Sequence, residues 1–192
     1  ECLINYAGAT ISWLKDNLKI LNNARETNEI LKKTKSSEEV VFIPAFVGLS
    51  SPHWLPDSKA MIYGLTPSIN KNHIVRAALE SIAFQIKDYL DDLEKNNKIK
   101  YNDIYIDGGI VSNKPFMQLL SNTLQKKIHV TNYQDMSSYG AFMMGLLGIN
   151  IVNHFNDMKK LKQKYLVYSP VKNQKMADSY KHWQYVLKKF YL

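Results

Sequence analysis

The feature that most restricts the fold of this chain is a short apolar strand, Ile104–Ile106, that runs almost directly into two glycines and a helix start. Gly108 and Gly109 lack a Cβ, so the backbone can adopt a positive φ there and a ligand can lie against bare main chain. Asn113 is a predicted helix cap, and the helix start beside it offers unpaired N–H groups to an anion. The junction therefore predicts a binding site for a phosphate or a nucleotide, although the same pattern also occurs as a plain tight turn.

Gly8 lies at a second junction of this kind, between the predicted strand Leu3–Ala7 and the predicted helix Ala9–Leu21. In an open α/β sheet, ligands bind outside the carboxyl ends of the strands. Two glycine junctions at strand ends therefore predict two walls of one nucleotide site. The alternative is that each glycine only permits tight packing.

Strands and helices alternate along the chain, which is typical of an α/β domain. We expect its sheet to be largely parallel and covered on both faces. Gly140, Gly145 and Gly148, in and just after the predicted helix Ser138–Leu147, would let that helix lie close to the sheet. Apolar spacing and turn residues predict further strands at Val40–Phe46, Met61–Gly64 and Ile128–Val130, and further helices at Asn28–Lys33, Asn72–Lys95, Lys114–Leu124, Asn153–Lys164 and Gln174–Phe190.

The positive charge of the chain is concentrated near its C-terminal end. Residues 151–192 carry nine lysines and two aspartates of a chain whose net charge is +8. We therefore expect two parts, a nucleotide-binding domain over residues 1–150 and a lysine-rich helical C-terminal extension over residues 151–192 that packs on it. These lysines are spread along amphipathic helices without arginine, so they predict a solvated face, with neither nucleic acid nor a membrane as partner. Weak attraction to polyanions is the alternative.

Cysteine content and apolar segments favour a cytoplasmic protein. Cys2 is the single cysteine, which excludes an internal disulfide and a cysteine-based zinc site and fits a reducing compartment. No signal peptide is visible, and the longest apolar run, from about Tyr139 to Val152, is too short to span a bilayer. Because the chain begins at Glu1 and not at Met, we expect a fragment of a longer protein.

Longer motifs carry a resemblance to a known family. Ala60–Leu65, followed after seven residues by His73–Glu80, fits the second signature of the FGGY carbohydrate kinases. Phe42–Trp54 and Leu79–Gln85 resemble the glycerol kinase branch of that family. The resemblance implies an α/β, actin-like ATPase (ribonuclease H-like) domain that is truncated at its N-terminal side and carries C-terminal helices. Residues 1–150 would then be the C-terminal nucleotide-binding domain of an FGGY kinase.

The resemblance also implies an activity. In the family, ATP lies in a cleft between two domains, and its γ-phosphate passes to a bound polyol. In the glycerol kinase branch the products are sn-glycerol 3-phosphate and ADP, and Mg²⁺ accompanies the nucleotide. The polyol-binding residues and the catalytic aspartate of the family lie upstream of Glu1, so we assign no catalytic residue here and expect the chain alone to be inactive. Glycerol would bind through the missing N-terminal domain, and the family resemblance favours a homodimer.

Five residues match nucleotide-binding positions of the family. Gly8 would contact the phosphates of ATP through its backbone N–H. Gly109 would lie against the adenosine, with Gly108 beside it, and Asn113 would offer its amide to the adenine edge. Ser12 stands where glycerol kinases usually have glutamine, and its shorter side chain leaves a contact with the nucleotide open.

Two alternatives to a glycerol kinase remain. Because the substrate-binding residues lie upstream, another polyol or sugar, such as xylulose, could replace glycerol. The chain could also belong to a non-catalytic actin-like module that binds ATP and acts through partners.

Other polar residues of the central segment have structural interpretations. Arg76 and Glu80 stand four residues apart on one predicted helix, which favours an ion pair over a role in catalysis. His53 and His73 have no second ligand at metal spacing, so we expect no metal site at either residue. Asn72 is the predicted N-cap of the helix that contains Arg76.

Overall fold

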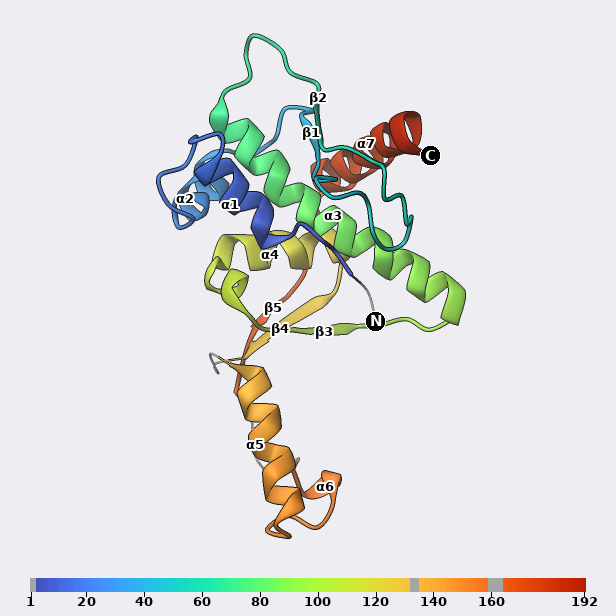
Figure 1. Ribbon diagram of the computed structural model, residues 1–192. Coiled ribbons are helices and arrows are strands. Elements are labelled where there is room, and N and C mark those ends of the chain that lie inside the picture. The colour runs from blue at the N-terminus through green and yellow to red at the C-terminus, as the bar shows by residue number, and fades with distance from the viewer. Residues whose placement is uncertain (1–2, 132–134, 159–163) are drawn as a thin grey trace.

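The long helix α3 (Lys71–Asn97) crosses the middle of the molecule in the computed structural model, which describes residues 3–131, 135–158 and 164–192 (Figure 1). Helices α1 (Gly8–Asp16), α2 (Glu26–Lys33) and α4 (Lys114–Leu124) contact it, as does α7 (Gln174–Tyr191). Every residue from Val75 to Phe84 is buried, because neighbours surround this part of α3 on all sides. The core of the molecule therefore lies around the first half of α3.

Local sequence signals account for the start of α3. The side chain of Asn70 accepts a hydrogen bond from the backbone N–H of Asn72 at 2.9 Å, and Nδ1 of His73 accepts one from the backbone N–H of Asn70 at 3.2 Å. This reciprocal arrangement is a capping box, which satisfies N–H groups at the helix start. The N-cap is thus Asn70 and not Asn72, whereas the predicted helix itself is confirmed.

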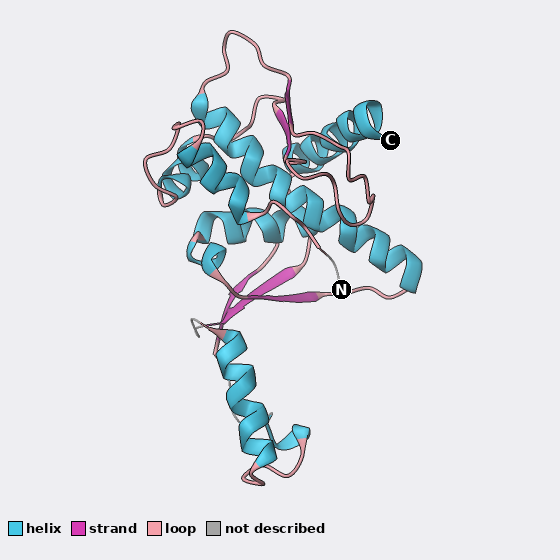
Figure 2. Cartoon of the chain, viewed as in Figure 1, coloured by secondary structure: helices cyan, strands magenta, loops and turns pink. Residues whose placement is uncertain are grey.

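Two small sheets flank the helices (Figure 2). Strands β1 (Val41–Ile43) and β2 (Met61–Tyr63) pair antiparallel. The second sheet has the order β3-β4-β5 and consists of β3 (Asp103–Ile106), β4 (Lys127–Thr131) and β5 (Tyr165–Tyr168). Strand β3 is parallel to β4, but β5 is antiparallel to it. The expectation of a largely parallel sheet is therefore wrong for the described residues.

Only one face of the second sheet is covered by a helix within the described residues. Helix α4 lies between this sheet and α3, and it packs on the face that carries Ile128 and Val130 (Figure 1). Tyr105, which points to the opposite face, is 63% exposed. The expectation of a sheet covered on both faces is wrong here.

Helix α5 (Met136–Gly148) does not cover the second face of this sheet, because it projects away from the sheet (Figure 1). None of its residues is buried, and a Cβ added to Gly140, Gly145 or Gly148 would meet no atom within 4 Å. These glycines therefore do not serve close packing of the helix on the sheet, contrary to the expectation from sequence. No helix within the described ranges combines the length and the apolar run that a membrane span requires.

The N-terminal segment Leu3–Ala7 forms bends and not the predicted strand. Two hydrogen bonds, each 3.3 Å long, join Leu3 to Ser51. The backbone N–H of Ser51 donates to the carbonyl of Leu3, and the backbone N–H of Leu3 donates to Oγ of Ser51. A strand needs a ladder of backbone hydrogen bonds with a neighbour. Helix α1 also ends at Asp16, earlier than predicted, and the chain reaches α2 through a loop.

Residues 151–192 form a strand as well as helices. Strand β5 lies between the two predicted C-terminal helices and extends the sheet; the sequence did not predict a strand there. Helix α6 (Phe155–Met158) covers part of the predicted helix Asn153–Lys164, and residues 159–163 of that prediction lie outside the described residues. Trp183 of α7 is 2% exposed and donates a hydrogen bond from Nε1 to the carbonyl of Phe42 at 3.2 Å. The last helix thus packs on β1.

Candidate functional site

Residues from four parts of the chain line one cavity of about 510 Å³. Helix α1 contributes Gly8 and Ser12, and the short helix η1 (Gly109–Ser112) contributes Gly109. Asn113 lies at the junction of η1 and α4. The structure thus brings together four of the five predicted site residues, although about a hundred positions separate the two glycines. The remaining lining residues are Ile11, Ala24, Arg25, Thr27, Asn28, Leu79, Ile110 and Ser112.

The start of α1 leaves its N–H groups without a capping side chain. Ala7 occupies the N-cap position and makes no side-chain hydrogen bond, unlike the serine, threonine, asparagine or aspartate that usually stand there. Gly8 is exposed, and a Cβ added to it would meet no atom within 4 Å. The first turn of this helix therefore presents bare backbone and a positive dipole end to the cavity, which suits an anion.

The two adjacent glycines have different roles. Gly108 has φ 93° and ψ 178°, a conformation that is essentially restricted to glycine, and it does not line the cavity. Gly109 does line it, and the space beside its Cα is open. Gly108 therefore makes the turn, and Gly109 offers bare backbone to the cavity.

Asn113 is 7% exposed and holds two walls of the cavity together. Its Oδ1 accepts a hydrogen bond from the backbone N–H of Phe116 at 3.0 Å and so caps α4. Its Nδ2 donates to Oγ1 of Thr27 at 2.9 Å, and that hydroxyl donates to the carbonyl of Ala24. One amide thus fixes the start of α4 against the segment that begins α2.

Residues 24–28 are not among the site residues predicted from the sequence. In the structure, Arg25, Thr27 and Asn28 line the cavity. Thr27, Ile30 and Leu31 have helical spacing and lie buried on one face of α2. This spacing indicates that α2 packs on the domain, but it does not identify the start of α4 as its partner. Arg25 adds a positive charge at the edge of a cavity that has no acidic lining residue.

The predicted ion pair of Arg76 and Glu80 is confirmed, with Nε of Arg76 2.7 Å from Oε1 of Glu80. Both residues are buried. Arg76 also donates hydrogen bonds to the carbonyls of Leu31 and Thr34, so the pair holds the end of α2 against α3. Burial raises the pKa of the Glu80 carboxyl, and the charge of Arg76 opposes this change.

The donor set of the cavity does not fit a metal ion held directly by this chain. Hard cations such as Mg²⁺ prefer carboxylate oxygens, and no aspartate or glutamate lines the cavity. Within the described ranges, no three His, Cys, Asp or Glu side chains form a group that could hold a metal ion. His53 instead lies 2.7 Å from Oδ2 of Asp88, and His73 belongs to the capping box of α3.

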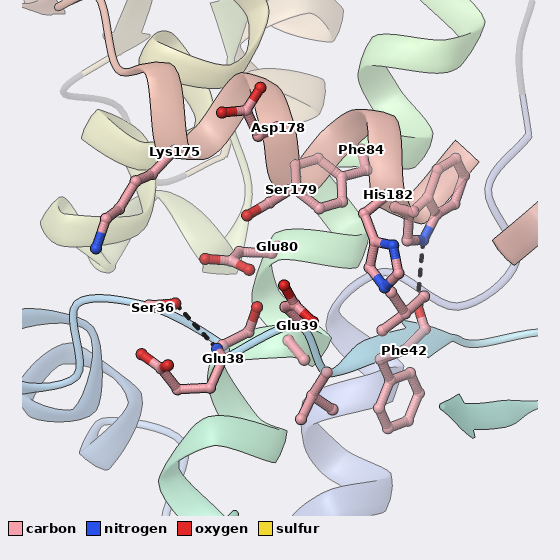
Figure 3. Close-up of a pocket in the computed structure, with 15 residues that line it drawn as sticks. Ser36, Glu38, Glu39, Phe42, Glu80, Phe84, Lys175, Asp178, Ser179 and His182 are labelled. Atoms are coloured by element: carbon pink, nitrogen blue, oxygen red, sulfur yellow. Dashed lines mark hydrogen bonds between the residues drawn. The ribbon is translucent and has the colours of Figure 1, made fainter. Parts of the chain in front are cut away.

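A second cavity of about 330 Å³ lies between residues 36–42, α3 and α7 (Figure 3). The carboxylates of Glu38, Glu39, Glu80 and Asp178 lie around it, and the aromatic rings of Phe84 and Trp183 are among its other lining groups. Like charges repel, so this lining disfavours the phosphates of a nucleotide. Charge therefore favours the cavity at Gly8 and Gly109 as the candidate nucleotide site.

Comparison with known proteins identifies the family. Residues 1–149 match the C-terminal domain of the FGGY family of carbohydrate kinases. Glycerol kinase of Shewanella halifaxensis is 33% identical over 190 residues, which cover 94% of this chain and 38% of that protein. Glycerol kinase of Vibrio parahaemolyticus is 35% identical over 193 residues, covering 98% of this chain and 37% of that protein. The chain belongs to the FGGY family of carbohydrate kinases.

Solved structures agree with this assignment. The crystal structure of Plasmodium falciparum glycerol kinase with ADP is 33% identical and has a TM-score of 0.86, covering 96% of this chain and 37% of that one. A ligand-bound xylulose kinase from Lactobacillus acidophilus has a TM-score of 0.85 at 18% identity, which shows a shared fold. The α/β actin-like ATPase class expected from the sequence is confirmed. The chain spans less than two fifths of the length of these relatives.

Proposed function

We propose that this chain is the nucleotide-binding C-terminal part of a glycerol kinase, which transfers the γ-phosphate of ATP to glycerol and releases sn-glycerol 3-phosphate and ADP. The observation that carries the proposal is the single cavity that joins Gly8, Ser12, Gly109 and Asn113. A relative with 33% identity and a TM-score of 0.86 was solved with ADP. The cavity volume of about 510 Å³ is within the usual range for a cofactor site.

Each predicted residue has a role in this proposal. The backbone at Gly8 binds phosphate oxygens at the positive end of α1, and Gly109 lies against the adenosine after the turn made by Gly108. Asn113 holds the wall near the adenine, and its amide has remaining donor and acceptor capacity for the adenine edge. Ser12 is exposed on α1 and lines the same cavity.

Phosphoryl transfer to a hydroxyl also needs a carboxylate that accepts the proton and a divalent metal that accompanies the phosphates. The nucleotide cavity offers no carboxylate for either purpose. We therefore assign catalysis, glycerol binding and direct contact with Mg²⁺ to parts of the enzyme outside this chain, and we expect the 192 residues alone to be inactive. A homodimer and a cytoplasmic location remain predictions from the sequence.

Glycerol is the favoured acceptor because the relatives with 33–35% identity are glycerol kinases, whereas the likeness to the xylulose kinase extends to the fold alone. The test is the production of ADP from ATP by the complete enzyme with glycerol, with xylulose and without an acceptor. We expect turnover that depends on glycerol. Turnover with xylulose and not with glycerol would identify xylulose as the substrate. Nucleotide binding without turnover would favour the non-catalytic module.

A further inference from the structure

Trp54 stands in the connection between β1 and β2 and is 65% exposed. The other two tryptophans, Trp13 and Trp183, pack in or against the hydrophobic core. Tryptophan has a large apolar surface that is usually covered at least in part, and exposed apolar surface marks contacts with partners. Trp54 is therefore a candidate contact residue.

The backbone conformation of Trp54 supports a contact role. Its φ is 54°, in the left-handed region, which is uncommon for residues other than glycine and especially for bulky ones. Such positions persist only where the surrounding structure fixes them, and they cluster at ligand contacts and switch regions. Burial of the indole does not offset this strain, which indicates a partner outside the described residues.

Contacts on both sides of Trp54 fix residues 47–56, which we call the Trp54 loop. Leu49 and Leu55 exchange two backbone hydrogen bonds, of 2.9 and 2.8 Å. Nε2 of His53 lies 2.7 Å from Oδ2 of Asp88, which anchors the loop to α3. The fold thus fixes the backbone at Trp54 and leaves the indole uncovered.

The segment that precedes α1 runs beside the Trp54 loop. Leu3 is joined to Ser51 by the two hydrogen bonds of 3.3 Å described above. The backbone N–H of Trp54 donates to the carbonyl of Ser50 at 2.8 Å, so Trp54 and Ser51 belong to one tight turn. Whatever precedes Leu3 in the complete enzyme therefore joins the chain next to this turn.

The rest of the kinase is the partner with the shortest route to this surface. The chain matches the C-terminal domain of its family and spans 37–38% of its glycerol kinase relatives, so most of the complete enzyme would precede Leu3. A part that is joined to the chain beside the loop has a high effective concentration there, which a separate molecule lacks. Leu3 and Val47 are exposed apolar side chains on the same two segments and extend the surface available to it.

We infer that Trp54, with Leu3 and Val47, forms the surface on which this C-terminal part of the kinase packs against apolar side chains of the part upstream of it. In the complete enzyme the indole of Trp54 is then shielded from water. The inference rests on the proposed function, because it needs the upstream part of the kinase.

Hydroxyl-radical footprinting of the complete wild-type enzyme, read by mass spectrometry, tests this shielding without any substitution. The oxidation rate of each residue is divided by its rate in the urea-unfolded enzyme, which removes differences in intrinsic reactivity. Trp183, 2% exposed, and Tyr185, 55% exposed, are the buried and exposed references on α7. We expect the normalised rate of Trp54 to fall to that of Trp183, whereas its exposure in this chain alone predicts a rate near that of Tyr185.

A substitution tests the same contact through stability. Trp54→Ala removes the indole, and loss of a buried ring should lower the melting temperature of the complete enzyme by about 2 °C or more. Tyr185→Ala is the matched control, because it removes an exposed aromatic ring and should leave the melting temperature nearly unchanged. An indole that stays in water would make the two substitutions equally mild.

Protection of Trp54, together with a lower melting temperature of Trp54→Ala, supports the inference. Oxidation of Trp54 at the rate of Tyr185 overturns it, and glycerol-dependent release of ADP by the same preparation then shows that the proposed function stands. Protection that is lost when the enzyme is diluted to single subunits would assign the surface to a second copy and would also overturn the inference.

Discussion

Nδ2 of Asn113 donates a hydrogen bond to Oγ1 of Thr27 at 2.9 Å, joining two residues that are 86 positions apart in the chain. Both residues are buried, and both line the candidate nucleotide cavity. The bond fixes the first turn of α2 against the start of α4. The shape of the cavity therefore depends on a side-chain contact as well as on the glycine turns.

Thr27→Val removes the hydroxyl and preserves the shape of the side chain. The amide of Asn113 then loses a buried partner, and such a loss costs about 1–3 kcal/mol of the free energy of unfolding. We expect a lower urea midpoint with an unchanged slope, together with weaker binding of ADP. Thr66→Val, at an exposed threonine, should change the stability by less than about 0.5 kcal/mol. Equal stability of the Thr27 variant and the wild type would show that the bond does not hold the wall.

Substitution by alanine should destabilise the fold at Gly108 but not at Gly109. At Gly108, where φ is 93°, alanine is strained and should destabilise the fold by about 1–3 kcal/mol. At Gly109, φ is not in the left-handed region and the space for a Cβ is open, so alanine should leave the melting temperature nearly unchanged. Thermal unfolding of both variants checks this difference, and equal destabilisation would contradict the distinct roles assigned to the two residues.

The buried pair of Arg76 and Glu80 should show strong coupling. Arg76→Met or Glu80→Leu alone leaves an unpaired buried charge and should cost about 3–5 kcal/mol. The double variant should be destabilised by less than the sum of the two, because it leaves neither charge behind. Lys87 and Asp91, 2.9 Å apart at the same spacing on α3 but more exposed, are the control pair, with an expected coupling of about 0.3–0.5 kcal/mol. Similar coupling in both pairs, measured by urea unfolding, would contradict this account.

Glu94 should contribute to stability in a pH-dependent way. Hydrogen bonds from Nζ of Lys126 and from the backbone N–H of Tyr101 lower the pKa of its carboxyl below the ordinary 4.5. The contribution of the ionised form is therefore present above pH 4.5 and is lost as the pH falls through the lowered pKa. Glu94→Gln should be less stable than the wild type by about 0.5–1 kcal/mol at pH 7.

The difference between Glu94→Gln and the wild type should shrink as the solution is acidified below pH 4.5. Glu39→Gln, at an exposed carboxylate, is the control and should differ little from the wild type at either pH. Urea unfolding at a series of pH values measures both variants. A difference for Glu94→Gln that stays constant on acidification would refute the assigned contact.

Helices with strong local signals were predictable from the sequence. Helix α4 has the predicted bounds, Lys114–Leu124, because Asn113 caps it and its apolar residues follow the helical period. Strand β5 was not predictable in this way, because a strand depends on a partner far away in the chain, here β4. Leu3–Ala7 shows the converse, since an apolar pattern without a paired neighbour formed bends.

The candidate site was predictable where it depends on the backbone. Gly8 and Gly109 stand at junctions whose glycines and helix starts can be recognised in the sequence. Thr27 and Asn28 could not be predicted, because their place in the cavity depends on α2 folding across the start of α4. Contacts between side chains at such separations leave no local pattern.

The central claim is that a nucleotide binds between Gly8 and Gly109, and a calorimetric titration of the complete enzyme with ADP tests it most directly. Gly109→Val adds a side chain in the open space of the cavity, whereas Gly140→Val adds one in open space on α5, outside it. We predict binding of one ADP that Gly109→Val weakens about tenfold or more, and that Gly140→Val leaves unchanged. Absence of ADP binding, or equal affinity in the Gly109 variant and the wild type, would contradict the account.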